Sequence, residues 1–320
     1  EQYNVGLDFS VFDERISLVV DLYSKTTRDL LLNSNVTNTA GVNKLYRNIG
    51  SVRNNGLEIT LNTINVQSRH FTWSSNFNIS FNRSKVLALT NDESQMLTPV
   101  KWTGNFNTTP LYITQVGGPL TAFYGFVYDG LYQVDEFYQA ADGSYTLKEG
   151  IPTNGTSDIA PGHIKFKDIN GDGQITDVDR VIIGRAEPIH TGGFNNNFRY
   201  KGFELSVLLQ WSYGARIMNA NRIMFEGNQS ERPINQFASY ADRYVPGKPS
   251  TYSSDNYAVG GQGPLGWYSS KTLEDGSYLR LKTVQLSYSI PKKYLRKIGV
   301  SQLQVYVSGN NIATLTGYTG

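Results

Sequence analysis

The sequence predicts an all-β fold, in which long antiparallel strands form a membrane-spanning barrel with long loops at one end. Three observations predict it: apolar and polar residues alternate with period two, one alternating run is unusually long, and short turns alternate with long connections. Composition agrees, because Tyr and Phe account for 21 and 15 of the 320 residues and aromatic side chains favour strands.

Alternation marks the strands directly. In Ile16–Leu22 the apolar side chains at 16, 18, 20 and 22 share one face, and Ser17 and Asp21 lie on the other. The same pattern runs through Leu57–Asn62, Phe71–Asn82, Phe203–Trp211, Tyr278–Ile290 and Leu303–Ser308. Such alternation is typical of half-buried antiparallel strands, and about nine are expected in all.

The run Phe71–Asn82 has the length of a membrane-spanning strand. Such strands take about 9–11 residues, whereas strands of globular proteins average about 5–6. Ser75 is its single lapse, and the face opposite the aromatic residues is wholly polar, as expected of a wall that lines a wet lumen. A soluble β-sandwich alternates in the same way, so alternation alone fits both folds.

The connections favour the barrel. Asn65–Arg69 is a short turn between two long strands, whereas Leu31–Ser51, Thr90–Leu120 and Gln229–Ser277 are long and rich in Gly, Asn, Ser and Pro. Loops beyond about 12–15 residues are uncommon in compact domains. Outer-membrane barrels combine short periplasmic turns with long extracellular loops.

Composition excludes several classes. The net charge is +2, with 18% charged residues, so no basic stripe for nucleic acid is present. Without cysteine there is no thiolate catalysis, zinc–thiolate site or disulfide framework. The longest apolar run is Val86–Leu89, far short of the about 20 residues of a transmembrane helix. The first residues show no signal peptide.

The sharpest motif is the segment from Asp168 to Asp179, which reads D-x-N-x-D-G-x-I-x-x-x-D. Oxygen-bearing side chains at positions 1, 3 and 5, a Gly at 6 and a carbonyl at 7 are the pattern of a Ca²⁺ loop. The candidate ligands are Asp168, Asn170, Asp172, Gln174 and Asp179. Position 12 is Asp instead of the usual Glu, and the flanks at 165–167 and 181–183 are expected to be extended. A metal-free turn built from Asp, Asn and Gly is the equal alternative.

No enzyme is expected. The three histidines, at 70, 163 and 190, are isolated from each other and from carboxylates, and the acidic pairs are adjacent residues of turns or loops. No nucleophile motif or phosphate loop is present. The aromatic residues Trp102, Trp267 and Tyr268 are the candidates for ligand contact, because each lies in a region expected to be a long loop.

The chain resembles the barrel of the SusC/RagA-type TonB-dependent transporters of Bacteroidetes. The resemblance rests on segments spread in family order over nearly the whole chain. They are Ser17–Leu31, Asn54–Ile59, Gly118–Leu120 with Tyr124–Phe126, Asp129–Tyr132, Pro161–Pro188, Gly192–Phe194, Tyr200–Ser206, Gly276–Lys282 and Ser308–Ile312.

The resemblance implies that residues 1–320 form a C-terminal part of such a barrel, without the plug domain and the final strands. It implies active import of oligosaccharides or peptides across the outer membrane. The expected partners are a SusD-like surface lipoprotein, TonB (through an N-terminal part absent here) and outer-membrane lipid. The alternative is a secreted, soluble β-rich carbohydrate-binding module with a calcium loop.

Overall fold

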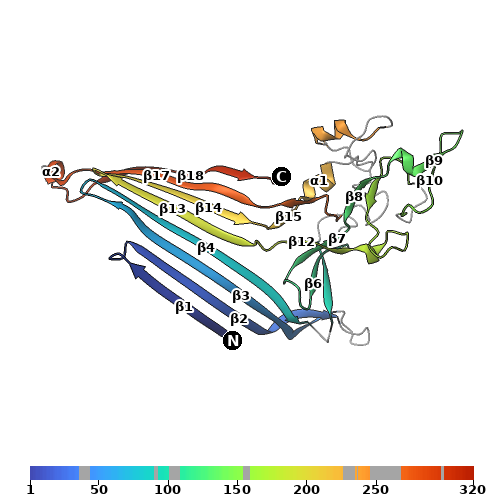
Figure 1. Ribbon diagram of the computed structural model, residues 1–320, viewed down its shortest axis with the longest axis horizontal. Coiled ribbons are helices and arrows are strands. Elements are labelled where there is room, and N and C mark those ends of the chain that lie inside the picture. Colours follow the sequence, from blue (N-terminus) through green and yellow to red (C-terminus); the bar gives the residue numbers. More distant parts are fainter. Residues whose placement is uncertain are drawn as a thin grey trace.

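The computed structural model describes residues 1–35, 44–89, 93–100, 109–153, 159–225, 235, 237–245, 268–296 and 299–320. It has two parts, a sheet of long strands and a folded layer at one end of that sheet (Figure 1).

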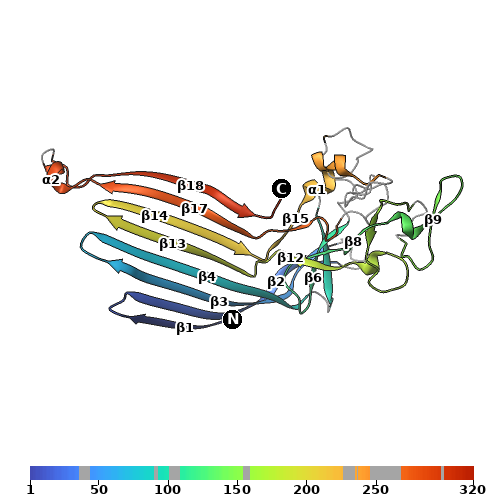
Figure 2. The ribbon, with the colours of Figure 1, turned by 45° about the horizontal axis from the view of Figure 1, so that its top comes forward.

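The large sheet has eight strands in the order β1-β2-β3-β4-β13-β14-β17-β18, and all neighbours are antiparallel. Figure 2 shows them side by side. Their bounds are β1 Gln2–Val11, β2 Ile16–Asn35, β3 Lys44–Gln67, β4 Phe71–Ala88, β13 His190–Tyr200, β14 Phe203–Tyr213, β17 Tyr278–Ser289 and β18 Gln304–Thr316. An antiparallel sheet of membrane-length strands is the predicted fold class.

The connections at the two ends of the sheet differ as predicted. At one end lie residues 12–15, 68–70 and 201–202, and a link of 290–303 that contains α2 (Lys292–Leu295). Lys201 and Gly202 both have positive φ, 47° and 91°, which is the backbone of a type I′ hairpin turn. At the other end the described parts of the connections 89–189 and 214–277 build the folded layer.

This outer layer contains short strands and helical turns. Its four-stranded sheet has the order β12-β7-β6-β5, from Val181–Arg185, Ala122–Gly125, Pro110–Gln115 and Gln95–Pro99. Three two-stranded pairs join β8 (Tyr128–Leu131) to β11 (Ile164–Phe166), β9 (Phe137–Gln139) to β10 (Tyr145–Leu147), and β15 (Arg216–Met218) to β16 (Leu273–Asp275). Helix α1 spans Ala220–Phe225, and short 3-10 turns span Val134–Glu136, Asp177–Asp179 and Ala238–Asp242. None of the helices described is long and apolar enough to cross a membrane.

The hydrophobic core lies in this layer. One cluster joins Leu111, Phe123, Ile223, Tyr268 and Leu273, and a second is built around Phe126 and Phe166. In the large sheet, by contrast, apolar side chains are mostly half-exposed. The sheet therefore depends on its surroundings for the burial that the layer obtains by itself.

The predicted loop boundaries were wrong in part. β2 and β3 extend through much of Leu31–Ser51, β5 and β6 lie inside Thr90–Leu120, and β16 lies inside Gln229–Ser277. Outside a membrane a strand is held by backbone hydrogen bonds to its neighbours. It can therefore continue through residues in which apolar and polar side chains do not alternate. The turn expected at Asn65–Arg69 is reduced to residues 68–70, since β3 runs to Gln67.

Candidate functional site

The register of the large sheet places most of the apolar residues of its eight strands on one face. Side chains of directly paired residues lie on the same face of a sheet. One such row runs across the sheet through Phe9, Leu18, Leu61, Phe77, Phe194, Leu209, Leu281 and Ala313. We call this face the apolar face. The predicted apolar sets of Ile16–Leu22 and Phe203–Leu209 both lie on it.

The neighbouring row lies on the opposite face and is almost wholly polar. It is displaced by one residue on the first six strands and by two and three residues on β17 and β18, where the register shifts. It comprises Ser10, Ser17, Asn62, Asn76, Asn195, Leu208, Thr283 and Asn310. Neighbours in it bond across the strands: Asn76 Nδ2 donates to Asn62 Oδ1 at 2.6 Å, and Thr283 Oγ1 donates to Asn310 Oδ1 at 3.0 Å. This polar face offers hydroxyl and amide groups to water and to a polar solute.

Aromatic side chains border the apolar face at both ends. Near the short turns, Trp73 stacks on Phe198 with ring centroids 5.7 Å apart, and Phe203 meets Tyr288 at 4.5 Å. Near the outer layer, His190 stacks on Tyr213 at 5.2 Å. The ten steps from Phe203 to Tyr213 at about 3.4 Å each, tilted by about 40°, span about 25 Å. This matches the apolar band of an outer-membrane barrel with its two aromatic girdles.

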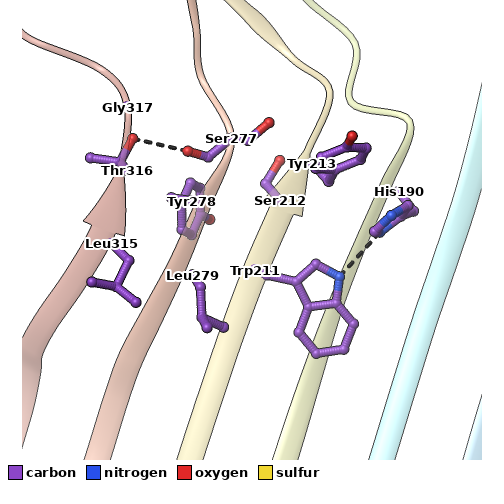
Figure 3. Close-up of a pocket in the computed structure, with 10 residues that line it drawn as sticks. All are labelled: His190, Trp211, Ser212, Tyr213, Ser277, Tyr278, Leu279, Leu315, Thr316 and Gly317. Carbon is purple, nitrogen blue, oxygen red and sulfur yellow. Dashed lines mark hydrogen bonds between the residues drawn. The ribbon is translucent and has the colours of Figure 1, made fainter.

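A shallow groove with a volume of about 590 Å³ lies in the outer girdle. Its lining residues come from β13, β14, β17 and β18 and from the residues next to these strands (Figure 3). Trp211 Nε1 donates to His190 Nδ1 at 3.1 Å. The indole covers Gly192, where a Cβ would lie 2.2 Å from the Trp211 ring, so the position requires glycine. The groove opens on the apolar face and is therefore a membrane-facing feature.

The single lapse in the alternation of β4, Ser75, has a partner on the apolar face. Its hydroxyl donates to Asn196 Oδ1 at 2.7 Å, and Trp73 Nε1 donates to the same oxygen at 3.0 Å. Ser75 and Asn196 are directly paired between β4 and β13. Ser75 Oγ also accepts from Asn65 Nδ2 at 2.7 Å. These hydrogen bonds satisfy the polar side chains among the apolar groups at the middle of this face.

The predicted calcium loop is folded by its own hydrogen bonds. The two oxygens of Asp168 accept the backbone N–H of Gly171 and Gly173, at 2.7 and 2.8 Å. Asn170 Oδ1 accepts from the backbone of Asp172, and Asp172 Oδ1 accepts from the backbone of Gln174. No cluster of three His, Cys, Asp or Glu groups suited to a metal occurs in the described part of the chain. The flanking segments are strands β11 and β12, as predicted.

Asp179, the last residue of the motif, is completely buried and ties the loop together. Its oxygens accept the backbone N–H of Ile169 at 2.9 Å and of Thr176 at 2.7 Å. Burial raises the pKa of this carboxyl, but the backbone hydrogen bonds from Thr176, Ile169 and Asn170 outweigh it and hold the pKa below its usual value. Asp179 therefore stays ionised inside the layer.

A second buried carboxylate, Glu274, was not singled out from the sequence. It accepts hydrogen bonds from Asn219 Nδ2 at 3.0 Å and from the backbone and hydroxyl of Thr319 at 2.8 and 2.7 Å, and it pairs with Arg222 at 3.4 Å. Burial raises its pKa, but these hydrogen bonds and Arg222 lower it by more. Glu274 thus joins β16, the start of α1 and the end of the chain, and no local sequence signal links these segments.

Of the candidate ligand-contact residues, only Tyr268 is among the described residues, and Trp102 and Trp267 lie outside them. Tyr268 is 1% exposed and packs with Leu111, Phe123 and Ile223. Its ring therefore forms part of the core of the layer.

Comparisons with known proteins agree with this geometry. A family model described as TonB dependent receptor-like, beta-barrel, matches residues 1–162. The chain is 34% identical over 320 residues to TonB-dependent receptor P3 of Formosa agariphila. The match covers 100% of this chain and 30% of that receptor. It is 25% identical over 325 residues to TonB-dependent receptor SusC of Bacteroides thetaiotaomicron. This match covers 99% of this chain and 29% of that receptor. The chain therefore spans less than a third of the length of these relatives.

Solved structures show the same fold. The chain is similar to the RagAB peptide transporter, with a TM-score of 0.73 and 23% identity. The match covers 100% of this chain and 32% of the chain in that structure. Against the RagAB peptide importer in its "closed-closed" state the TM-score is 0.75, with the same identity and coverage.

Proposed function

Because this chain belongs to the TonB-dependent receptor β-barrel family, as an outer-membrane barrel segment of the SusC/RagA type, we propose that its parent protein imports oligosaccharides or peptides. The observation that carries the proposal is the polar row across all eight strands, on the face opposite the apolar row. Oligosaccharides and peptides are rich in hydroxyl and amide groups, which the side chains of this row match.

The proposed mechanism involves no covalent chemistry. A SusD-like surface lipoprotein and the outer layer enclose the substrate, and TonB, acting on an N-terminal plug, opens the path along the polar face. Side chains of the polar face then exchange hydrogen bonds with the moving solute, so no single contact holds it tightly. The family consists of transporters, and this supports the proposal that the chain carries no catalytic residue.

Family membership excludes the alternative of a secreted, soluble binding module, because outer-membrane barrels place their apolar face against lipid. The calcium loop is a separate proposal: we propose that Asp168, Asn170 and Asp172 bind Ca²⁺ when it is supplied. The residue types at positions 1, 3, 5 and 6 support it, and carboxylate oxygens that accept one hydrogen bond keep further lone pairs.

The test of the transport proposal starts from the full-length parent protein, purified from outer membranes in detergent. We expect mass spectrometry to identify a SusD-like lipoprotein that co-purifies with it. Thermal shifts with defined oligosaccharide and peptide mixtures then assign the substrate class. Purification without a lipoprotein, together with no thermal shift by either mixture, would contradict the proposal.

A further inference from the structure

A basic cluster continues the apolar face of β3 and β4 toward the outer layer. Above Phe81 on this face come Arg83, paired with Asn55, and then Lys85, paired directly with Arg53. The ladder is regular over these pairs, so the three cationic side chains lie on the same face as Phe81 and Leu57. We call Arg53, Arg83 and Lys85 the outer basic cluster.

The height of this cluster matches a lipid headgroup region. Phe81 contacts His190 of the outer girdle, with ring centroids 5.5 Å apart. Arg83 and Lys85 lie two and four residues beyond it, which is about 5 and 10 Å along the membrane normal for strands tilted by about 40°. Headgroups add about 5–7 Å on each side of the hydrocarbon core, and long basic side chains reach back toward them.

The cluster has more positive charge than its described neighbours balance. Arg53 and Lys85 are direct cross-strand partners, and like charges in this position repel. Glu1 pairs with Arg28 at 3.5 Å and faces Arg53. Within the described ranges, Lys85 has no ion pair, and Arg83 uses only Nη1, on the carbonyls of Asn82, Pro188 and Ile189. A bound anion would relieve this repulsion.

An apolar groove lies directly below the cluster. It has a volume of about 580 Å³ and is lined by Val5, Leu22, Leu57 and Phe81, with Arg83 at its outer end. The groove of Figure 3, of about 590 Å³, lies in the same girdle but is lined by uncharged side chains and His190. Of these two grooves, the one below the basic cluster combines an apolar floor with a cationic rim, and the groove of Figure 3 does not.

We propose that the outer basic cluster and the groove beneath it bind a net-anionic, phosphate-bearing lipid of the outer leaflet. An acyl chain lies along Leu22, Leu57 and Phe81, and the phosphate meets Arg53, Arg83 and Lys85. Each cation near a membrane surface contributes about fivefold in affinity, so two contribute about 30-fold. The inference is independent of the transported substrate.

The test uses the detergent-solubilised full-length parent protein, titrated with monophosphoryl lipid A and followed by native mass spectrometry. The variant Arg53→Gln/Lys85→Gln spares Arg83, which donates to three backbone carbonyls. It replaces Arg53, whose Nε makes one hydrogen bond, to Thr26 Oγ1 at 3.3 Å. The control Lys25→Gln/Arg280→Gln removes the same charge from the polar face of β2 and β17. We expect the first variant to bind lipid A about 30-fold more weakly and the control to bind it like the wild type.

Phosphatidylcholine provides the second arm, and it should bind all three proteins equally. Equal lipid A affinity in the first variant, an equal loss in the control, or full displacement of lipid A by inorganic phosphate would each overturn the proposal. If Arg53→Gln/Lys85→Gln does not fold, the salt dependence of lipid binding by the wild-type protein still tests the proposal. Its lipid A affinity must fall with ionic strength while its phosphatidylcholine affinity does not, and lipid A binding that is insensitive to salt refutes the charge contact.

Discussion

Leu208 and Leu209 are adjacent leucines at the middle of β14, and their register predicts opposite responses to the same substitution. Leu209 belongs to the apolar row, between Phe194 and Leu281, whereas Leu208 belongs to the polar row, between Asn195 and Thr283. The strand runs from Phe203 to Tyr213, so residue 208 is its midpoint and 209 lies about 2.5 Å from that depth along the membrane normal.

Leu209→Lys therefore places an ammonium near the bilayer midplane. A Lys on the lipid face at this depth costs about 2–4 kcal/mol, whereas lumen-facing substitutions are tolerated. We expect Leu209→Lys to lower the free energy of unfolding of the parent protein by that amount. Leu208→Lys, which meets water and polar neighbours, should change it by less than about 1 kcal/mol.

The assay is guanidinium unfolding of the parent protein in lipid vesicles, followed by tryptophan fluorescence and by gel mobility of the folded barrel. The midpoint should fall for Leu209→Lys and stay close to the wild type for Leu208→Lys. Equal losses in the two variants, or a larger loss at 208, would mean that the assignment of the two faces is wrong.

Three further predictions concern single interactions. Asn196→Ala leaves two donors without their acceptor on the apolar face, so it should destabilise the protein by about 1–3 kcal/mol in the same assay, while Asn197→Ala on the polar face should be nearly neutral. If the calcium loop binds metal, Ca²⁺ should raise the melting temperature of the parent protein, and Asp168→Ala/Asp172→Ala should abolish the rise; a melting temperature that never responds to Ca²⁺ or a chelator ends the proposal. The lowered pKa of Glu274 means that this carboxylate stabilises the outer layer above its unfolded pKa of about 4.5. That stabilisation is lost as pH falls through the lower folded pKa, so Glu274→Gln should flatten the fall of the melting temperature below about pH 4.5; an unchanged acid profile would refute its role.

The sequence predicts the barrel wall well because the wall is governed by a local rule. Inside a membrane each strand must alternate, so the faces of Ile16–Leu22 and Phe203–Leu209 follow from the residues alone. Beyond the membrane, apolar and polar side chains no longer have to alternate. For this reason the sequence does not predict the ends of β2 and β3 that lie there. The lapse at Ser75 needed the pairing of β4 with β13, because its partner Asn196 is 121 residues away.

The outer layer could not be predicted for a related reason. Its core brings Leu111, Phe123, Ile223 and Tyr268 together, and no sequence period connects segments so far apart in the chain. Tyr268 shows the consequence. The sequence predicts a ligand contact for this aromatic residue of a long Gly-rich segment, and the structure places its ring in the core of the layer. For the same reason the network of Glu274 carried no signal in the sequence.

The two parts of the chain are stabilised in different ways, and their junction has to connect them. The sheet depends on lipid to cover its apolar face, whereas the layer buries its own clusters. At the junction Val52, Val86 and Leu89 pack together, and Val86 exchanges backbone hydrogen bonds with Gly117 and Gly118 at 2.8 and 2.9 Å. Because this contact sits on β3 and β4 just beyond the girdle, it fixes the layer to the wall independently of the lipid. A layer held in this way keeps its position at the end of the large sheet, whatever lipid covers the apolar face.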